Sequence, residues 1–158
     1  MLDAEEYLAL AVHASSVKDH HTCLTYLDEV LRQQPRNASA LFLRAVQHAE
    51  LGLTAHALRD LEAALQINPG LEIARFRLGM LLLIGAGRRA EAKEHLAKLA
   101  GTRDVALRFY AEGLIALADN DLACAQTKIE AGLAAPSSNP GLAAMLSQLL
   151  GTYRQISS

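Results

Sequence analysis

Three histidines and a cysteine near the N-terminal end of the sequence are the first residues that could do chemistry, as ligands of a metal ion. His20, His21 and Cys23 are nearly adjacent, and His13 precedes them. Zinc takes three or four converging ligands, usually supplied as two paired clusters. The sequence offers one cluster. The residue pattern around Cys23 recurs three times further along the chain, and alanine takes the place of the cysteine each time, at Ala57, Ala92 and Ala125. Packing therefore explains this group better, and no metal is predicted.

A glycine-rich turn raises the prospect of a nucleotide cofactor. Gly85, Gly87 and Ala90 match the spacing of a dinucleotide fingerprint, and Asp104 follows. That fingerprint needs a strand before the turn and a parallel strand after it. Residues 78–84 keep a helical register instead, so the turn is predicted to join two helices and no cofactor is expected.

Nucleophilic catalysis has no signature in this chain. A glycine-flanked serine of the G-x-S-x-G type is absent from the sequence. Helices joined by short turns also provide few strained positions for such a nucleophile. The sequence therefore predicts no catalytic residues and a protein that is not an enzyme.

Length, charge and composition narrow the class of protein. The chain has 158 residues, which suits a single domain over 1–158, and a formal charge of −2. Such a balance gives no field that would attract nucleic acid or anionic lipid, and no apolar run is long enough for membrane insertion. Two distant cysteines and an acidic N-terminal segment without signal-peptide features favour a soluble cytoplasmic protein.

Helix-forming residues dominate the sequence, and their pattern repeats every 34 residues. One column of the repeat is always small, and two others are always apolar. The columns are Ala11, Ala45, Gly79 and Gly113; Leu8, Phe42, Phe76 and Tyr110; and Val12, Val46, Met80 and Leu114.

Each period reads as two helices. In residues 40–70 a break at Leu51-Gly52 separates two helical patterns, and Asn68-Pro69-Gly70 ends the second. A glycine suits a helix C-terminus, and proline cannot continue a helix. The pattern resembles the tetratricopeptide repeat. Matching residues are Tyr7, Leu10, Ala11, Cys23, Leu27 and Pro35; Leu41, Ala45, Ala57, Leu61 and Pro69; Leu78, Gly79, Ala92 and Leu96; and Phe109, Gly113, Ala125, Ile129 and Pro136.

The resemblance implies an all-α fold, a right-handed α-solenoid of about four helix–turn–helix units. The expected repeats cover about 4–37, 38–71, 72–101 and 102–136, and a capping helix follows at about 140–155. Arg44 and Glu112 depart from the pattern at a leucine position. The third repeat lacks the proline and gains one residue, which predicts a local distortion at 84–90.

The first helices of such repeats line a concave face in this family. The resemblance therefore implies a partner-binding groove with an apolar wall that becomes more apolar toward the C-terminal half. Its expected residues are Leu8, Val12, Phe42, Val46, Phe76, Met80, Leu83, Ile84, Tyr110 and Leu114. Packing between neighbouring repeats is the competing explanation for these residues. A clamp for two carboxylates is not expected, because Leu8, Val12, Leu43 and Ile73 occupy its positions and Arg77 is the sole basic match.

The expected function is that of a protein-interaction scaffold or adaptor. Its groove would bind an apolar peptide or helix of a protein partner. The size of the chain and its apolar groove are similar to those of bacterial secretion chaperones built from such repeats, which makes a chaperone-like role one form of this function. The alternative is a self-association or docking module of a larger assembly or longer protein, in which the apolar wall joins copies into a homo-oligomer.

Overall fold

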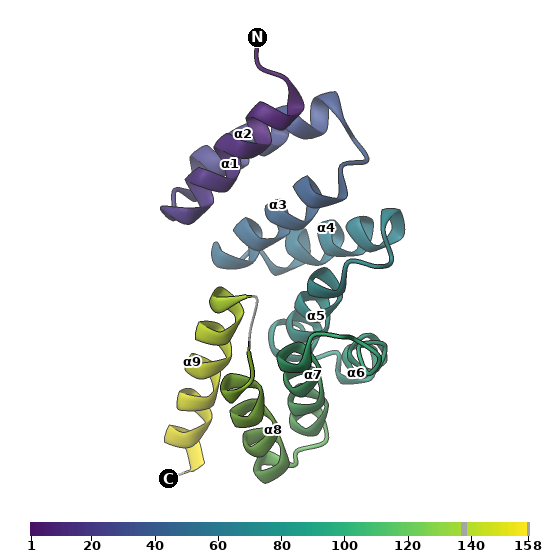
Figure 1. Ribbon diagram of the computed structural model, residues 1–158, viewed down its shortest axis with the longest axis vertical. Helices are drawn as coiled ribbons and strands as arrows, with labels where there is room; N and C mark the ends of the chain where they lie inside the picture. Colours follow the sequence, from purple (N-terminus) through teal and green to yellow (C-terminus); the bar gives the residue numbers. More distant parts are fainter. Residues whose placement is uncertain (137–138, 158) are drawn as a thin grey trace. The chain divides into compact units, whose positions relative to one another are not determined.

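The computed structural model describes residues 1–136 and 139–157, and helices dominate it (Figure 1). Its contacts divide the chain into two compact units, unit 1 (Met1–Leu81) and unit 2 (Leu82–Ser158). Within the described residues the secondary structure is helical, without strands. The prediction of an all-α fold of helix–turn–helix repeats with a terminal helix is confirmed, whereas the single-domain prediction stays a prediction.

Unit 1 contains two helix hairpins and a fifth helix. Within each hairpin the two helices run antiparallel (Figure 1). The elements are α1 (Ala4–Ser16), α2 (His20–Gln33), α3 (Ala38–Glu50), α4 (Thr54–Ile67) and α5 (Glu72–Met80).

Unit 2 contains a π-helical turn, one further hairpin and two single helices. The elements are the π-helical turn (Leu81–Gly85), which begins at the last residue of unit 1, α6 (Arg89–Ala97), α7 (Val105–Ala118), α8 (Leu122–Ala134) and α9 (Pro140–Ser157).

Short polar side chains fix where the helices begin. Asp3, Asn37 and Asp104 each precede a helix, and each accepts a hydrogen bond from the backbone N–H three residues later. Such a bond satisfies a donor that has no partner within the helix. At α1 the side chain of Glu6 also accepts a hydrogen bond from the backbone N–H of Asp3, which completes a capping box.

A left-handed residue recurs in the turn inside every repeat. Lys18, Gly52, Gly87 and Asn120 occupy equivalent positions in the four repeats, and all have φ between 60° and 77°. Gly87 is therefore the third copy of a turn residue, and glycine takes this conformation at little steric cost. This role explains the glycine that resembled a nucleotide-binding motif in the sequence.

The extra residue of the third repeat lies inside a helix rather than in its turn. After α5, residues 81–85 form one turn of π-helix, which fits more residues per turn than an α-helix. The predicted distortion at 84–90 therefore begins earlier than expected. Gly87 is in its usual place after the π-helical turn, so the turn has absorbed the insertion.

Small residues bring paired helices together, as the small column predicts. At Gly113 of α7, an added Cβ atom would lie 2.8 Å from Cγ1 of Ile129 and 3.3 Å from the carbonyl oxygen of Ala125 on α8. A side chain there would push the two helices apart. Ala11 and Ala45 are buried at the same column in unit 1.

Helix α9 lies beside α8 (Figure 1) and packs on it. Leu142, Leu146 and Leu150 are buried, and their spacing of four residues places them on one face of the helix. This arrangement fits the predicted capping role, because the last hairpin would otherwise expose the apolar face of α8.

Candidate binding site

Seven of the ten residues predicted to line a groove are at least partly accessible. Val12 is 54% exposed and Ile84 is 47% exposed. The other accessible residues are half-buried, and they are Leu8, Phe42, Val46, Met80 and Leu83. Leu83 and Ile84 belong to unit 2, and the other five belong to unit 1.

The prediction of an open surface is wrong for the other three residues. Phe76, Tyr110 and Leu114 are 0%, 1% and 0% exposed, so they are core residues. Tyr110 shows the physical reason. An added Cβ atom on Gly132 of α8 would lie 2.5 Å from the Tyr110 ring, so this glycine leaves room for the ring between α7 and α8.

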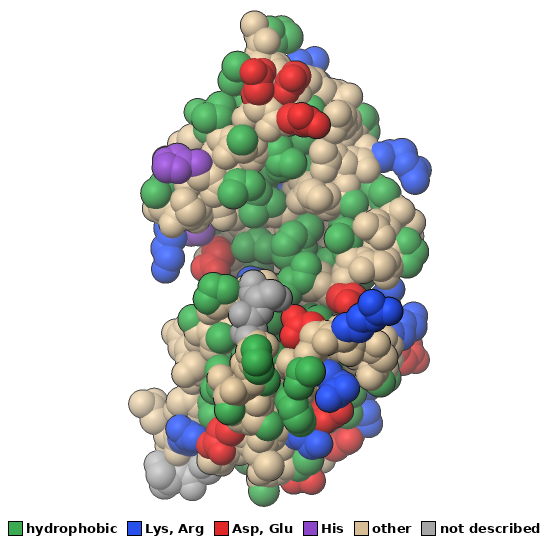
Figure 2. Space-filling model, viewed as in Figure 1, with side chains coloured by type: hydrophobic (Ala, Val, Ile, Leu, Met, Phe, Trp, Pro, Cys, Tyr) green, Lys and Arg blue, Asp and Glu red, His purple; other side chains and the backbone are tan. Residues whose placement is uncertain are grey.

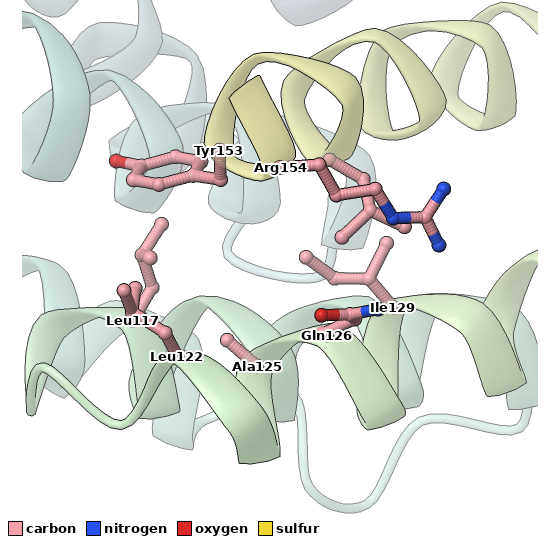
Figure 3. Close-up of a pocket in the computed structure, with 8 residues that line it drawn as sticks. Leu117, Leu122, Ala125, Gln126, Ile129, Tyr153 and Arg154 are labelled. Atoms are coloured by element: carbon pink, nitrogen blue, oxygen red, sulfur yellow. The ribbon is translucent and has the colours of Figure 1, made fainter. Parts of the chain in front are cut away.

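The predicted trend toward a more apolar wall in the C-terminal half is wrong for α7, where the corresponding residues are core. Leu117 and Ala118 of α7 extend the predicted wall by one turn beyond Tyr110 and Leu114, and both are buried. Leu117 lies beneath Tyr153 of α9, and both line a small cleft that α7, α8 and α9 share (Figure 3). Helix α9 thus covers apolar surface that the sequence pattern assigned to a groove.

Two of the accessible apolar residues of unit 1, Val46 and Met80, line a cleft between α3, α4 and the end of α5. Hydrophobic side chains gather on the face of unit 1 formed by α1 and α3 (Figure 2). The cavity has a volume of about 40 Å³, enough for a methyl-sized group, and its lining is apolar except for one arginine. The lining residues are Ala45, Val46, Ala49, Leu61, Arg77, Met80 and Leu81.

Arg77 is the polar residue of this apolar cleft. Its Nε atom is buried and has no hydrogen-bond partner among the described residues. Burial lowers the pKa of the guanidinium, and the negative charge of Glu50 opposes this shift. Arginine nevertheless stays protonated in proteins, so the cleft holds a desolvated cation with an unused donor.

A second, charged pocket lies on the opposite side of α3, and sequence reasoning missed it. Arg44 donates two hydrogen bonds of 2.8 Å to the carboxylate of Asp60, which is buried on α4. Helical geometry separates Arg44 from Phe42 and Val46 by about 160° around the helix axis. The two sides of α3 thus present different surfaces.

The signal for this ion pair was present in the sequence. Arg44 and Glu112 both replace a leucine of the repeat, and each has an opposite charge 16 residues later. In unit 2, Nζ of Lys128 lies 3.0 Å from Oε2 of Glu112. The second and fourth repeats therefore carry the same pair with its charges reversed.

The histidine and cysteine group does not come together as a metal site. Cys23 is fully buried, and Nδ1 of His20 lies 2.7 Å from Oε1 of Gln47 in a hydrogen bond to α3. Within the part of the chain that the structure describes, no three His, Cys, Asp or Glu side chains are placed to hold a metal ion.

None of the described helices combines the length and the apolar character that crossing a membrane requires.

Solved structures with similar folds include three that cover most of this chain. MamA from Desulfovibrio magneticus RS-1 (41-end) is 22% identical, with 82% of this chain and 73% of that chain covered and a TM-score of 0.68. PilW, a type IV pilus biogenesis factor, is 21% identical, with 94% and 70% covered and a TM-score of 0.73. The APC/C hetero-tetramer Cut9–Hcn1 is 21% identical, with 98% of this chain but 30% of that chain covered and a TM-score of 0.80.

No family model matches the sequence, and no curated protein matches it. The similar structures are those of tetratricopeptide-repeat proteins, and identities of this size show a shared fold alone. With its 34-residue columns and helical hairpins, this chain has the fold of tetratricopeptide-repeat proteins.

Proposed function

We propose that this chain is a protein-interaction module whose unit 1 binds an apolar segment of a protein partner. The observation that carries the proposal is the cleft lined by Val46 and Met80, together with the accessible apolar side chains of α1 and α3 in the same unit. Monomeric proteins seldom leave such side chains together on one face without a use. The similarity to tetratricopeptide-repeat scaffolds supports this class of function.

The binding energy would come from apolar anchors. Val12 and Phe42 retain accessible surface on α1 and α3. Burial of apolar surface contributes about 25 cal/mol per Å² before the entropic costs of association are subtracted, and a few aromatic or aliphatic anchors dominate most interfaces. The partner segment is therefore expected to carry aliphatic or aromatic side chains at helical or extended spacing.

Arg77 adds one polar requirement to the partner. Its buried Nε donor has no partner in the described residues, and a hydrogen-bond acceptor of the partner would satisfy it. Residues 8, 12, 43 and 73 are apolar, so Arg77 is the one basic residue among the five positions of the carboxylate clamp. We propose an apolar segment with a single acceptor near Met80.

Selection of peptides tests this function. A library of random 12-residue peptides would be selected against the whole chain, and the affinities of the winners measured for Val12→Gln and Phe42→Gln. We expect apolar winners whose affinity falls by about 1–3 kcal/mol per variant. Val17→Gln is the matched control, because Val17 is 61% exposed but lies in the turn after α1. Equal binding by all variants would refute the proposed surface.

Self-association through the same surface is the alternative function, and sedimentation at increasing protein concentration separates the two. A mass that rises with concentration in the wild type, but not in Phe42→Gln, would favour the alternative. The chaperone-like role, the absence of catalysis, the absence of nucleic-acid binding and the cytoplasmic location stay predictions.

A further inference from the structure

The charged pocket on the far side of α3 has more polar groups than its ion pair requires. It is a cavity of about 440 Å³ within unit 1, between α2, α3 and α4. Its polar lining consists of Asp28, Arg44, His48, His56, Arg59 and Asp60.

The charged groups at the inner wall of the pocket, Arg44 and Asp60, are already paired with each other. Both carboxylate oxygens of Asp60 accept from Arg44 at 2.8 Å, which is the fork geometry that suits a guanidinium and a carboxylate. Nδ1 of His48 also approaches Asp60 Oδ2 at 3.3 Å, without the alignment of a good hydrogen bond. Asp60 is thus already engaged, and it leaves no open carboxylate for a cation to bind.

The outer part of the pocket contains hydrogen-bond donors that make weak contacts with the protein. Nη1 of Arg44 lies 3.5 Å from Asp28, whose side chain is 69% exposed, and such a surface pair contributes little. His56 stands edge-on to His48, with ring centroids 5.3 Å apart. Arg59 is exposed at the rim and forms no ion pair with the residues that the structure describes.

The fourth repeat serves as an internal control for the structural explanation. It carries the pair Glu112–Lys128 at the positions of Arg44 and Asp60. The positions equivalent to His48, His56 and Arg59 there are occupied by Ala116, Cys124 and Thr127. An ion pair at this place in the repeat therefore needs neither imidazoles nor a second guanidinium.

We propose that this pocket binds an oxyanion, the carboxylate or phosphate group of a small organic acid or of an acidic side chain. Arg59 and His56 would donate to it at the rim, and Nη1 of Arg44 would exchange its weak contact with Asp28 for the ligand. Arginine and imidazole N–H groups are suited to both kinds of oxyanion. The pocket is larger than one such group, so the ligand carries further atoms. This inference is independent of the apolar surface on the other side of α3.

Titration of the whole protein with inorganic phosphate and, separately, with citrate tests the proposal. Imidazole resonances of His48 and His56 would be followed by NMR at constant ionic strength. We expect a saturable shift with at least one of the two anions, and the stronger of them identifies the chemistry. Arg59→Gln should weaken this binding at least about tenfold, and His56→Gln should weaken it as well.

Arg36→Gln is the matched control, because Arg36 is an exposed arginine of unit 1 outside the pocket. It changes the charge equally and should leave the affinity unaltered. Thermal melting verifies that each variant is folded. Shifts that stay linear with both anions, or equal losses in Arg59→Gln and Arg36→Gln, would overturn the proposal.

Discussion

The ion pair between Arg44 and Asp60 permits a sharp test, because other repeats of the same chain provide replacement residues. Asp60→Asn keeps the shape of the side chain but leaves the Arg44 guanidinium without its counterion. Hydrogen bonds to charged groups contribute about 1.5–3 kcal/mol each. Two are affected, but the Arg44 side chain is 28% exposed and Asp28 lies nearby, so solvent screening reduces the loss. We expect the free energy of unfolding to fall by about 2–3 kcal/mol.

Two double variants then separate charge from packing. Arg44→Glu with Asp60→Lys copies the fourth repeat and should recover most of the loss. Arg44→Leu with Asp60→Tyr copies Leu10 and Tyr26 of the first repeat. It should equal the wild type or exceed it, because apolar residues often replace buried ion pairs without loss.

Chemical denaturation monitored by circular dichroism measures these differences, and thermal melting gives a second reading. A loss of 2–3 kcal/mol corresponds to a shift of about 4–12 °C for a chain of this size. A change of less than about 0.5 kcal/mol in Asp60→Asn would contradict the reasoning, since the pair would then contribute nothing. If Asp60→Asn is destabilised and neither double variant recovers the lost free energy of unfolding, then the geometry of the Arg44–Asp60 pair, and not its charge, determines the stability here.

Three further predictions concern single residues. Burial lowers the pKa of His48, with Arg44 and His56 adding to the shift and Asp60 opposing it; neutral His48 therefore stabilises the fold above pH of about 6.5, and this contribution falls at lower pH. The unfolding free energy of the wild type relative to His48→Gln should accordingly decrease between pH 7.5 and 5.5 in denaturant titrations. Leu146→Ala should lower the free energy of unfolding by about 2–5 kcal/mol in the same assay, because this side chain of α9 is fully buried. An unchanged midpoint would mean that α9 does not cap the last hairpin. Gly132→Ala should lower the melting temperature, because its methyl group would meet the Tyr110 ring at 2.5 Å, whereas Gly151→Ala, with no atom that close, should not.

The sequence was sufficient to predict the helices, and it predicted the pairing of those in the first, second and fourth repeats. These features are predictable because caps, left-handed turn residues and small columns act locally and recur at one period. The left-handed position in the turn is occupied by Gly87 in the third repeat and by Asn120 in the fourth. Such features depend on a residue and its close neighbours, so a single sequence reveals them.

The groove was only partly predictable, because a column defines a face of a helix but not what covers that face. Leu8 and Tyr110 share a column, yet the first is half-buried and the second is core. The difference comes from residue 132, a glycine, where the equivalent residue of the first repeat is Val30. Burial of Tyr110 thus depends on a residue of the next helix, outside its own column.

The ion pair was missed for a related reason. Taken one at a time, Arg44 and Glu112 are simply departures from a leucine column. The ion pairs become visible when each residue is compared with the residue 16 positions later, which has the opposite charge. A column compares the same position across repeats, so it does not reveal two positions that change together within one repeat.

The reversed charges of these two pairs limit how the helices can be recombined. A hairpin moved as a whole keeps its pair, either Arg44 with Asp60 or Glu112 with Lys128. Exchange of α4 for α8 alone would place Arg44 against Lys128 and Glu112 against Asp60, so each hairpin would contain two like charges. The unit that can be shuffled in this chain, in the laboratory or by recombination of its gene, is therefore the helix pair and not the single helix.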